Sequence, residues 1–459
     1  MTDPTDPRPP SPSFATTQVQ AGYSAGVAQN PAITPIYQSN AYEFGSLAEA
    51  RDLFAVRTVG NVYSRNANPT QLVFEARIAQ LEGGTSAVAV ASGQAATAGA
   101  VLALARAGDH VVAARQLYGG TIDLLQESLA DLGISTTFVD QDDFSAWAAA
   151  VRPETRLFFA ESITNPLAAV LDIRAVADIA HAAGVPLVVD NTVATPYLVR
   201  PGEFGADIVV HSATKYIGGH GSSLGGVVVD LGSFDFGADP ERWPQFTAPF
   251  ARIGGSSLWK RFGAEGQALA VWLKTKYVHD FGPTLSAFNS FQFLQGLETL
   301  DLRMRRHSDS ALAVARFLAD HPAVSVVHHP GLESSPWHAT AARVLPRGAS
   351  SVFAFDLAPS GDALLDESRV EHVIDGLRVI RLVANIGDAR SLVSHPASMT
   401  HSHLDADQLR EAGISPTTIR LSIGLEDVAD VIADLTQSLD AAYAEHPGAS
   451  AAPRHSELR

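Results

Sequence analysis

Short apolar runs alternate with helical segments between residues 70 and 230, and this pattern constrains the fold more than any other feature. Seven runs are predicted to be strands: residues 88–91, 110–113, 135–139, 157–160, 186–189, 207–210 and 226–229. Apolar and β-branched runs of this length are typical of strands buried on both faces. We therefore expect an α/β fold with a mostly parallel sheet flanked by helices. In such sheets, ligands bind at the carboxyl ends of the strands.

The pattern changes after residue 285. The sequence predicts helices at 300–318, 368–377 and 427–443 and strand-like segments at 325–328 and 351–355. This mixture is typical of an α+β domain. We assign residues 70–280 to the large sheet domain and residues 281–445 to a C-terminal α+β domain.

Both ends of the chain differ from these domains. Residues 14–69 show little hydrophobic periodicity but carry prolines and aromatic residues, which favours an extended arm that packs on another surface. Residues 1–13 and 446–459 are rich in proline and charged residues and are predicted to be disordered tails.

Composition excludes several classes of function. The formal net charge is −17, so nucleic acid and anionic membranes are unfavourable partners. The chain has no cysteine, which excludes disulfides, thiolate nucleophiles and Cys-ligated zinc. The uncharged stretch 85–105 is long enough to span a bilayer, but polar residues and glycines interrupt it, which favours a buried strand, turn and helix. The N-terminus lacks the apolar run of a signal peptide, so we expect a cytoplasmic protein.

Lys215 is the strongest candidate for a reactive amine. It follows the apolar strand 208–210 and two hydroxyl residues, Ser212 and Thr214. A lysine at a desolvated strand end loses proton affinity and becomes nucleophilic toward carbonyl groups. Taken alone, such a lysine is more often structural or salt-bridged. The remaining lysines are interpreted as solvated surface charges: Lys260, Lys274 and Lys276.

Other groups near Lys215 match the needs of pyridoxal phosphate (PLP). Asp190 closes an apolar strand one crossover before Lys215, and a carboxylate there can keep a pyridine nitrogen protonated. By itself, Asp190 is read equally well as a helix cap. The turn Ser92-Gly93-Gln94 precedes an Ala-rich helix, whose N-terminus can bind an anion such as phosphate.

Eight stretches of the chain carry a wider resemblance. They are residues 63–70, 92–96, 117–121, 190–197, 211–221, 384–388, 395–401 and 419–426. In these stretches, which span roughly residues 14–445 in the same order, the chain resembles the Cys/Met metabolism family of PLP-dependent enzymes, and among them most closely the O-acetylhomoserine (O-acetylserine) sulfhydrylases. It departs from the family at Asn66-Ala67, where Ile-Gly is common, and matches it least at 230–265.

The resemblance implies the fold type I of PLP-dependent transferases and a role for each matching residue. Lys215 is implied to bind PLP covalently and to move protons at Cα and Cβ of the substrate. Tyr118 is implied to stack on the pyridine ring and to assist proton transfer. Asp190 is implied to pair with the pyridinium, Thr192 to lie near the ring, and Asn165 to bond the phenolic oxygen.

The family also implies a phosphate site shared between subunits. The residues concerned are Gly93, Gln94, Ser212 and Thr214, together with Tyr63 and Arg65 of the neighbouring subunit. The active site would then require a dimer, and family members usually form dimers of dimers. We therefore expect a homotetramer with shared active sites, which gives the arm at 14–69 a surface to pack on.

The implied substrate site comprises Arg420 and Asn385, with Tyr63 nearby. The planar fork of an arginine suits bidentate binding of an α-carboxylate. Three histidines, His395, His401 and His403, lie close in sequence, but the family makes this stretch structural, and we expect no metal.

The implied reaction is γ-replacement on O-acetyl-L-homoserine by sulfide or methanethiol in methionine biosynthesis, which gives homocysteine or methionine and acetate. The alternatives are a cystathionine γ-synthase or a methionine γ-lyase reaction, although methionine γ-lyases typically carry Cys at the position of Gly120. Two hypotheses come from other classes of protein function: a PLP-binding module without catalysis and a dinucleotide-binding oxidoreductase. The chain lacks the Gly-x-Gly-x-x-Gly turn after the first strand that the oxidoreductase requires.

Overall fold

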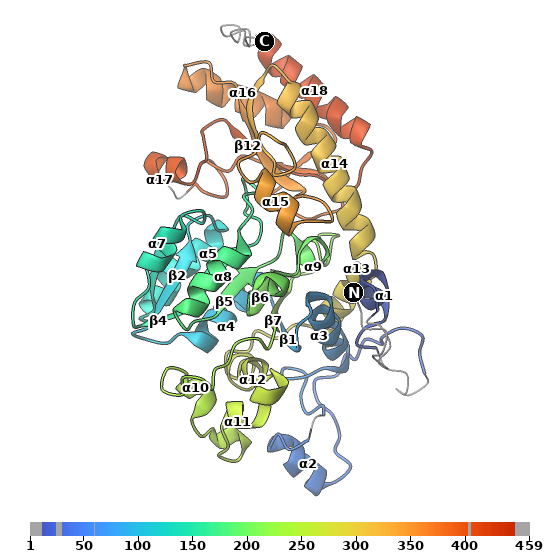
Figure 1. The fold of residues 1–459 in the computed structure, drawn as a ribbon. Coiled ribbons are helices and arrows are strands. Elements are labelled where there is room, and N and C mark those ends of the chain that lie inside the picture. Colours follow the sequence, from blue (N-terminus) through green and yellow to red (C-terminus); the bar gives the residue numbers. More distant parts are fainter. Residues whose placement is uncertain (1–11, 24–29, 59, 403–404, 446–459) are drawn as a thin grey trace, which may run out of the picture.

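The structure is a computed structural model that describes residues 12–23, 30–58, 60–402 and 405–445. The predicted tail at 446–459 and residues 1–11 of the N-terminal tail lie outside the described residues, as does His403. Two sheets organise the chain, and Figure 1 shows one of them in the middle of the molecule and the other near the C-terminus.

The large sheet has seven strands in the order β1-β7-β6-β5-β4-β2-β3. Their bounds are β1 Ser86–Val90, β2 His110–Ala114, β3 Ser135–Val139, β4 Thr155–Glu161, β5 Leu187–Asp190, β6 Ile208–Ser212 and β7 Gly226–Asp230. The neighbours from β3 to β6 are all parallel, whereas β7 runs antiparallel to both β6 and β1. The predicted mostly parallel sheet is confirmed, and all seven predicted strands are present.

Helices pack on this sheet and begin where the sequence provides caps. The helix α3 (Pro69–Glu82) has Asn68 as its N-cap and proline as its first residue, and it ends at Gly83 in the left-handed conformation. The helix α4 (Gly93–Leu104) begins at Ser92, whose hydroxyl accepts a bond of 3.1 Å from the Ala95 N–H. The two helices contact β1 and β6–β7 respectively. The sheet and the caps together therefore fix where α4 starts, which matters for the site.

The remaining α-helices before the second sheet are mostly short. They are α1 Phe14–Gln20, α2 Leu47–Phe54, α5 Gly119–Asp123, α6 Leu129–Asp131, α7 Phe144–Ala149, α8 Ile173–Ala182, α9 Thr195–Leu198, α10 Pro244–Thr247, α11 Leu258–Phe262, α12 Ala268–Trp272 and α13 Ala287–Leu297. Two π-helical segments follow α5 and α12, at Leu124–Ser128 and Leu273–Phe281.

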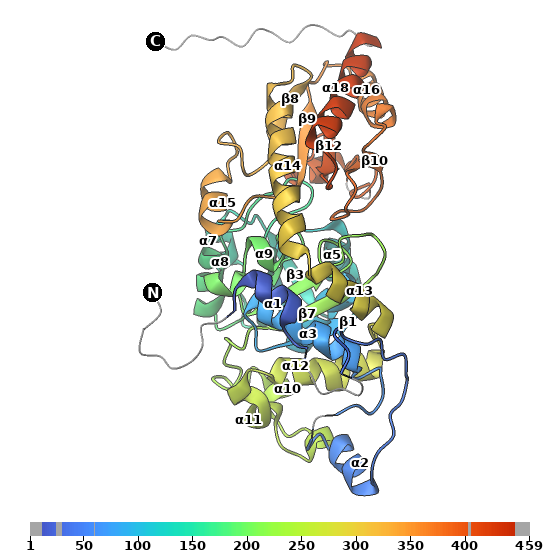
Figure 2. The same ribbon diagram turned by 90° about the vertical axis from the view of Figure 1, so that its right-hand side faces the viewer.

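The second sheet has five strands in the order β10-β11-β12-β9-β8. They are β8 Val324–His328, β9 Val352–Leu357, β10 Arg381–Leu382, β11 Leu392–Ser394 and β12 Thr418–Ser422, and the helices around them are α14 Leu300–Asp320, α15 His338–Val344, α16 Ala363–Gly376, α17 Ala406–Glu411 and α18 Val428–Glu445. Figure 2 shows α14 running from the level of the large sheet to the second sheet. This part has the predicted α+β character, while its predicted boundary at residue 281 stays a prediction.

The N-terminal arm is more helical than the sequence indicates. The helix α1 packs on α3, whereas α2 lies apart from both sheets in Figures 1 and 2. The side chains of Leu47 and Phe54 on α2 are 68% and 69% exposed. The helix forms because Ser46 caps it by accepting a bond from the Glu49 N–H, a local signal that hydrophobic periodicity does not report.

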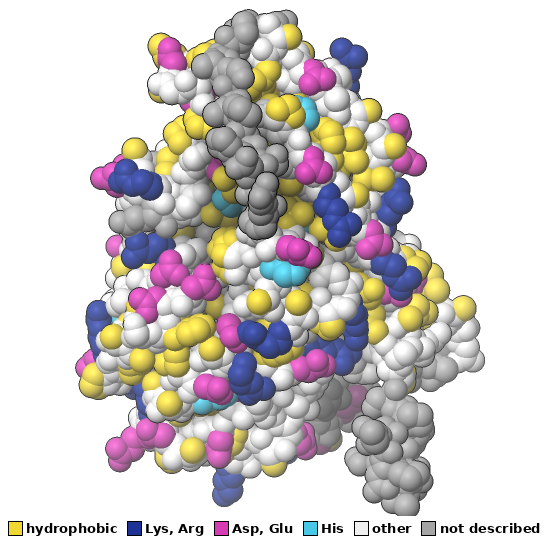
Figure 3. Space-filling view, turned by 45° about the horizontal axis from the view of Figure 1, so that its top comes forward, with side chains coloured by type: hydrophobic (Ala, Val, Ile, Leu, Met, Phe, Trp, Pro, Cys, Tyr) yellow, Lys and Arg dark blue, Asp and Glu magenta, His cyan; other side chains and the backbone are white. Residues whose placement is uncertain are grey.

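One surface prediction is wrong. The Nζ of Lys274 lies 2.5 Å from the buried Glu75 carboxylate, so this lysine is the partner of an internal charge and not a solvated one. Over the face in Figure 3, acidic and basic side chains are interspersed with apolar ones. None of the helices that the structure describes is long and apolar enough to cross a membrane.

Candidate active site

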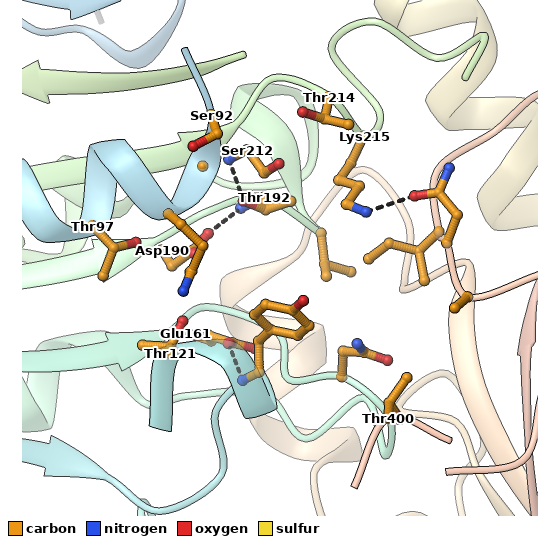
Figure 4. A pocket seen from close by; sticks show the side chains of 18 of the residues that line it. Ser92, Thr97, Thr121, Glu161, Asp190, Thr192, Ser212, Thr214, Lys215 and Thr400 are labelled. Atoms are coloured by element: carbon orange, nitrogen blue, oxygen red, sulfur yellow. Dashed lines mark hydrogen bonds between the residues drawn. The ribbon is translucent and has the colours of Figure 1, made fainter. Parts of the chain in front are cut away.

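A cavity of about 270 Å³ lies at the carboxyl ends of β4, β5 and β6 and is closed on one side by residues of the C-terminal part (Figure 4). Eleven of the thirteen predicted site residues line it. They are Gly93, Gln94, Tyr118, Asn165, Asp190, Thr192, Ser212, Thr214, Lys215, Asn385 and Arg420. The topology explains their meeting, because parallel strands deliver the residues that follow them to the same edge of the sheet.

Lys215 lies in the turn after β6 and points into the cavity (Figure 4). Its Nζ donates a hydrogen bond of 2.5 Å to Asn385 Oδ1. Burial, and secondarily the positive charge of Arg420, lowers the pKa of Lys215 to about 8. The uncharged amine, which attack on a carbonyl carbon requires, is therefore far more populated near neutral pH than in an ordinary lysine.

Asp190 ends β5 at the floor of the same cavity. Its Oδ1 accepts a bond of 2.9 Å from the Thr192 N–H, and the Thr192 hydroxyl accepts one of 2.8 Å from the Ser212 N–H. Burial raises the pKa of Asp190 above its ordinary value, against the hydrogen bonds from Thr192. A buried carboxylate of this kind suits a cationic ring nitrogen such as a pyridinium.

A buried network lies beside the ends of β5 and β6. His211 Nε2 is 2.6 Å from Glu82 Oε1, and the Asn191 side-chain amide donates to the same oxygen at 2.9 Å. All three residues are buried. The network joins the ends of β5 and β6 to the last turn of α3. These contacts hold the end of β5, and with it Asp190, in place.

The N-terminus of α4 faces the hydroxyl residues after β6. A Cβ atom on Gly93 would lie 2.6 Å from Ser212 Cβ, so only glycine allows the helix to approach this closely. The hydroxyl of Thr214, the second hydroxyl residue of this turn, is bonded to Gly225. A helix N-terminus next to hydroxyl groups is a suitable site for a phosphate.

Tyr118 and Asn165 come from the turns after β2 and β4. The Tyr118 N–H donates a bond of 2.6 Å to Glu161 Oε1, and its ring is 46% exposed. The Gln94 side chain donates to the Gly120 carbonyl at 2.7 Å, which joins this turn to α4. Asn165 precedes a cis peptide bond to proline.

Arg420 lies on β12 and reaches the cavity from the second sheet. One Nη donates to the Asn385 carbonyl at 2.8 Å, and the other lies 3.4 Å from Asn165 Oδ1. Burial lowers the pKa of Arg420 to about 10. Its Nε has no hydrogen-bond partner among the described residues, so the guanidinium retains capacity to bind a carboxylate.

Tyr63 and Arg65 are the two predicted site residues that do not line this cavity. They border a separate surface groove with Thr284, whose hydroxyl donates to the Arg65 carbonyl at 2.6 Å. The Arg65 guanidinium lies 5.4 Å from the centre of the Tyr63 ring, which is itself partly exposed. Their predicted role in a neighbouring subunit stays a prediction.

Sequence reasoning missed several polar residues that line the cavity: Thr97, Thr121, Glu161 and Thr400 (Figure 4). Glu161 was predictable from the sequence, since it ends an apolar strand just as Asp190 does. The three threonines lie in segments whose sequence gives no such signal. No group of three or more possible metal ligands occurs among the described residues.

Known proteins resemble this chain over most of its length. The profile of the family described as Cys/Met metabolism PLP-dependent enzyme matches residues 15–440. Proteins named O-acetyl-L-homoserine sulfhydrylase from Corynebacterium glutamicum and Leptospira meyeri are 46% and 44% identical, covering 92% and 88% of this chain and 95% and 91% of theirs. A Campylobacter jejuni structure described as an O-acetylhomoserine (thiol)-lyase has a TM-score of 0.88 and 35% identity, covering 93% of this chain and 99% of its own. That structure carries N'-pyridoxyl-lysine-5'-monophosphate.

Proposed function

The chain belongs to the Cys/Met metabolism family of PLP-dependent enzymes, and we propose that its reaction is γ-replacement on O-acetyl-L-homoserine. The reaction breaks the Cγ–O bond and forms a Cγ–S bond. Acetate leaves, and sulfide gives homocysteine whereas methanethiol gives methionine. The names and the high identity of the relatives support this substrate, and the geometry around Lys215 supports the chemistry.

The described residues fit PLP. Lys215 would hold it covalently, Asp190 would pair with its ring nitrogen, and the N-terminus of α4 with Ser212 and Thr214 would hold its phosphate. When bound, PLP supplies a ring that accepts the electron pair left when a substrate proton is removed. Thr192, Tyr118 and Asn165 would complete the surroundings of the ring.

Lys215 then acts on the substrate as a base and an acid. With its pKa lowered to about 8, its amine can take up the Cα proton and move protons at Cα and Cβ. The bond from Nζ to Asn385 Oδ1 aims the amine toward the segment that we assign to the substrate. Tyr118 assists these proton transfers from the opposite turn.

Arg420 binds the α-carboxylate of the amino-acid substrate. Its buried guanidinium has an unpartnered Nε, and its Nη atoms contact Asn385 and Asn165 at the cavity wall. A carboxylate bound there would satisfy the guanidinium by a charge-assisted bond of about 1.5–3 kcal/mol.

Gly120 is the observation that favours replacement over a methionine γ-lyase reaction. A Cβ on residue 120 would lie 2.7 Å from Tyr118 Cε1, so any side chain there must displace the Tyr118 ring. The ring position in this chain therefore depends on the absence of the Cys that methionine γ-lyases typically carry. A cystathionine γ-synthase reaction remains the second candidate, since it shares the same γ-carbon chemistry.

We further propose that the enzyme is a cytoplasmic homotetramer, built as a dimer of dimers with shared active sites. The exposed Tyr63, the neighbouring Arg65 and the projecting α2 support an arm that serves a second subunit. In that arrangement, Tyr63 and Arg65 would complete the phosphate site of the neighbour.

Steady-state assays test the proposed reaction. O-acetylhomoserine, O-succinylhomoserine, O-acetylserine and methionine are each incubated with sulfide, methanethiol or cysteine, and the products are identified. We expect homocysteine or methionine from O-acetylhomoserine, and a loss of at least about 10³-fold in Lys215→Ala, which also loses the absorbance of lysine-bound PLP. Exclusive breakdown of methionine would refute the proposal.

A further inference from the structure

Glu161 is a buried acid of the cavity that the reaction outlined above does not use. It is the last residue of β4 and the register partner of Asp190 on β5, and its side chain is 5% exposed. Partners on adjacent parallel strands lie about 5 Å apart and point to the same face. Figure 4 shows Glu161 in the cavity wall together with Asp190.

We propose that Glu161 is a positioning residue whose uncharged carboxyl group fixes the turn that carries Tyr118 and leaves Asp190 as the single negative charge of the pair. This inference rests on the proposed PLP enzyme, because Tyr118 and Asp190 contact the cofactor ring in that proposal.

The positioning contact is direct. Glu161 Oε1 accepts a hydrogen bond of 2.6 Å from the N–H of Tyr118. Tyr118 is the residue directly before α5. The Tyr118 ring is nearly half exposed, so the protein matrix around the ring does not by itself fix its place. This hydrogen bond joins the turn that carries Tyr118 to the end of β4, the strand that pairs with β5 and so lies beside Asp190. A shift of this bond would therefore move the ring relative to the strand ends.

The charge state follows from the same surroundings. Burial, and then the charge of Asp190, raises the pKa of Glu161 well above its ordinary value, against hydrogen bonds from the main chain at Tyr118 and Asn165. Of the other groups around the cavity, His211 lowers the pKa of Asp190 and Arg420 lowers the pKa of Lys215. Two adjacent buried carboxylates do not both ionise readily, and a cationic ring beside Asp190 would keep that one ionised.

Two substitutions separate these roles. Glu161→Gln keeps an oxygen that can accept the Tyr118 N–H and mimics the uncharged acid, whereas Glu161→Ala removes the acceptor. We expect Glu161→Gln to bind PLP with a dissociation constant within about threefold of the parent enzyme, and Glu161→Ala to bind about tenfold more weakly, as expected for one lost hydrogen bond. Circular dichroism of the bound cofactor should fall in Glu161→Ala and be retained in Glu161→Gln. The exposed Glu127→Gln serves as the matched control.

Infrared spectroscopy of the holoenzyme tests the charge directly. Burial also raises the pKa of Asp230 to about 7, so the band of Glu161 is read from the difference between the spectra of the parent and of Glu161→Gln. This difference should contain the C=O stretch of one protonated carboxyl group near neutral pH. The idea is overturned if the difference lacks that band, if Glu161→Gln binds PLP as weakly as Glu161→Ala, or if Glu161→Ala matches the parent. Should Glu161→Ala fail to fold, the infrared band and the Gln variant still decide the question. None of these readouts requires turnover of O-acetylhomoserine, so they stand apart from the test of the reaction.

Discussion

Replacing Gly93 with alanine tests whether the close approach of α4 to β6 forms the phosphate site. The added Cβ would lie 2.6 Å from Ser212 Cβ and 2.9 Å from Ser212 Oγ. Carbon atoms in contact normally lie about 3.5–4.0 Å apart, so the helix N-terminus must retreat by about 1 Å. Such a shift breaks one short N–H···phosphate bond, which contributes about 1.5–3 kcal/mol when one partner is charged. We therefore expect the dissociation constant for PLP to rise about 10- to 150-fold.

The assay is a titration of the apoenzyme with PLP, followed by absorbance and by thermal unfolding of each form. Helix propensity alone favours alanine over glycine by up to about 1 kcal/mol, so weaker binding cannot come from the helix itself. Gln94→Ala, one residue on, is the matched control, because it keeps the main-chain donors and loses only the bond to Gly120. Unchanged binding in Gly93→Ala would refute the reasoning.

Three further outcomes follow from the site. Gly120→Ala should displace the Tyr118 ring, since the new Cβ would lie 2.7 Å from Cε1, and lower kcat about tenfold; steady-state kinetics check this, and an unaltered kcat would contradict it. Arg420→Lys loses the planar fork of the guanidinium and should raise KM for the amino-acid substrate about 10- to 100-fold, while PLP binding stays near that of the parent. Steady-state kinetics measure this, and a rise in KM for the sulfur donor alone would contradict the role assigned to Arg420. The rate at which apoenzyme captures PLP should increase through about pH 8 and level off above it, because the lowered pKa of Lys215 sets where its amine loses the proton; stopped-flow absorbance measures this, and a rate still rising at pH 10 would show an unperturbed lysine.

The sequence predicted the parts of this fold that depend on continuous apolar runs. All seven strands of the large sheet are present, because six of them are almost wholly buried apolar runs. The edge strand β3 is mostly half-buried, and its β-branched residues still predicted a strand. The two shortest strands, β10 and β11, have two and three residues and leave no periodic signal. The helix α2 was missed for a different reason: a local cap at Ser46 specifies it, and most of its apolar side chains have no core to face.

Site residues were predictable where a polar residue ends an apolar strand, as at Asp190, or follows it closely, as at Lys215. Residues 384–386 and Arg420 came only from the resemblance to a known family, since nothing in their local sequence says that the second sheet faces the first. Lys274 was misjudged because its partner, Glu75, lies 199 residues away in the sequence. Contacts of that range are fixed by tertiary packing and not by local pattern.

The cavity wall is assembled from two sheets, and this has an evolutionary consequence. The strand ends of the large sheet provide the lysine and the aspartate, whereas β12 and the segment 384–386 provide the groups that we assign to the amino acid. Changes in the second sheet can therefore alter which amino acid is accepted without altering the machinery on the first. Related enzymes with this fold can therefore evolve new substrate preferences through substitutions in the second sheet, while the lysine and the aspartate of the large sheet stay unchanged.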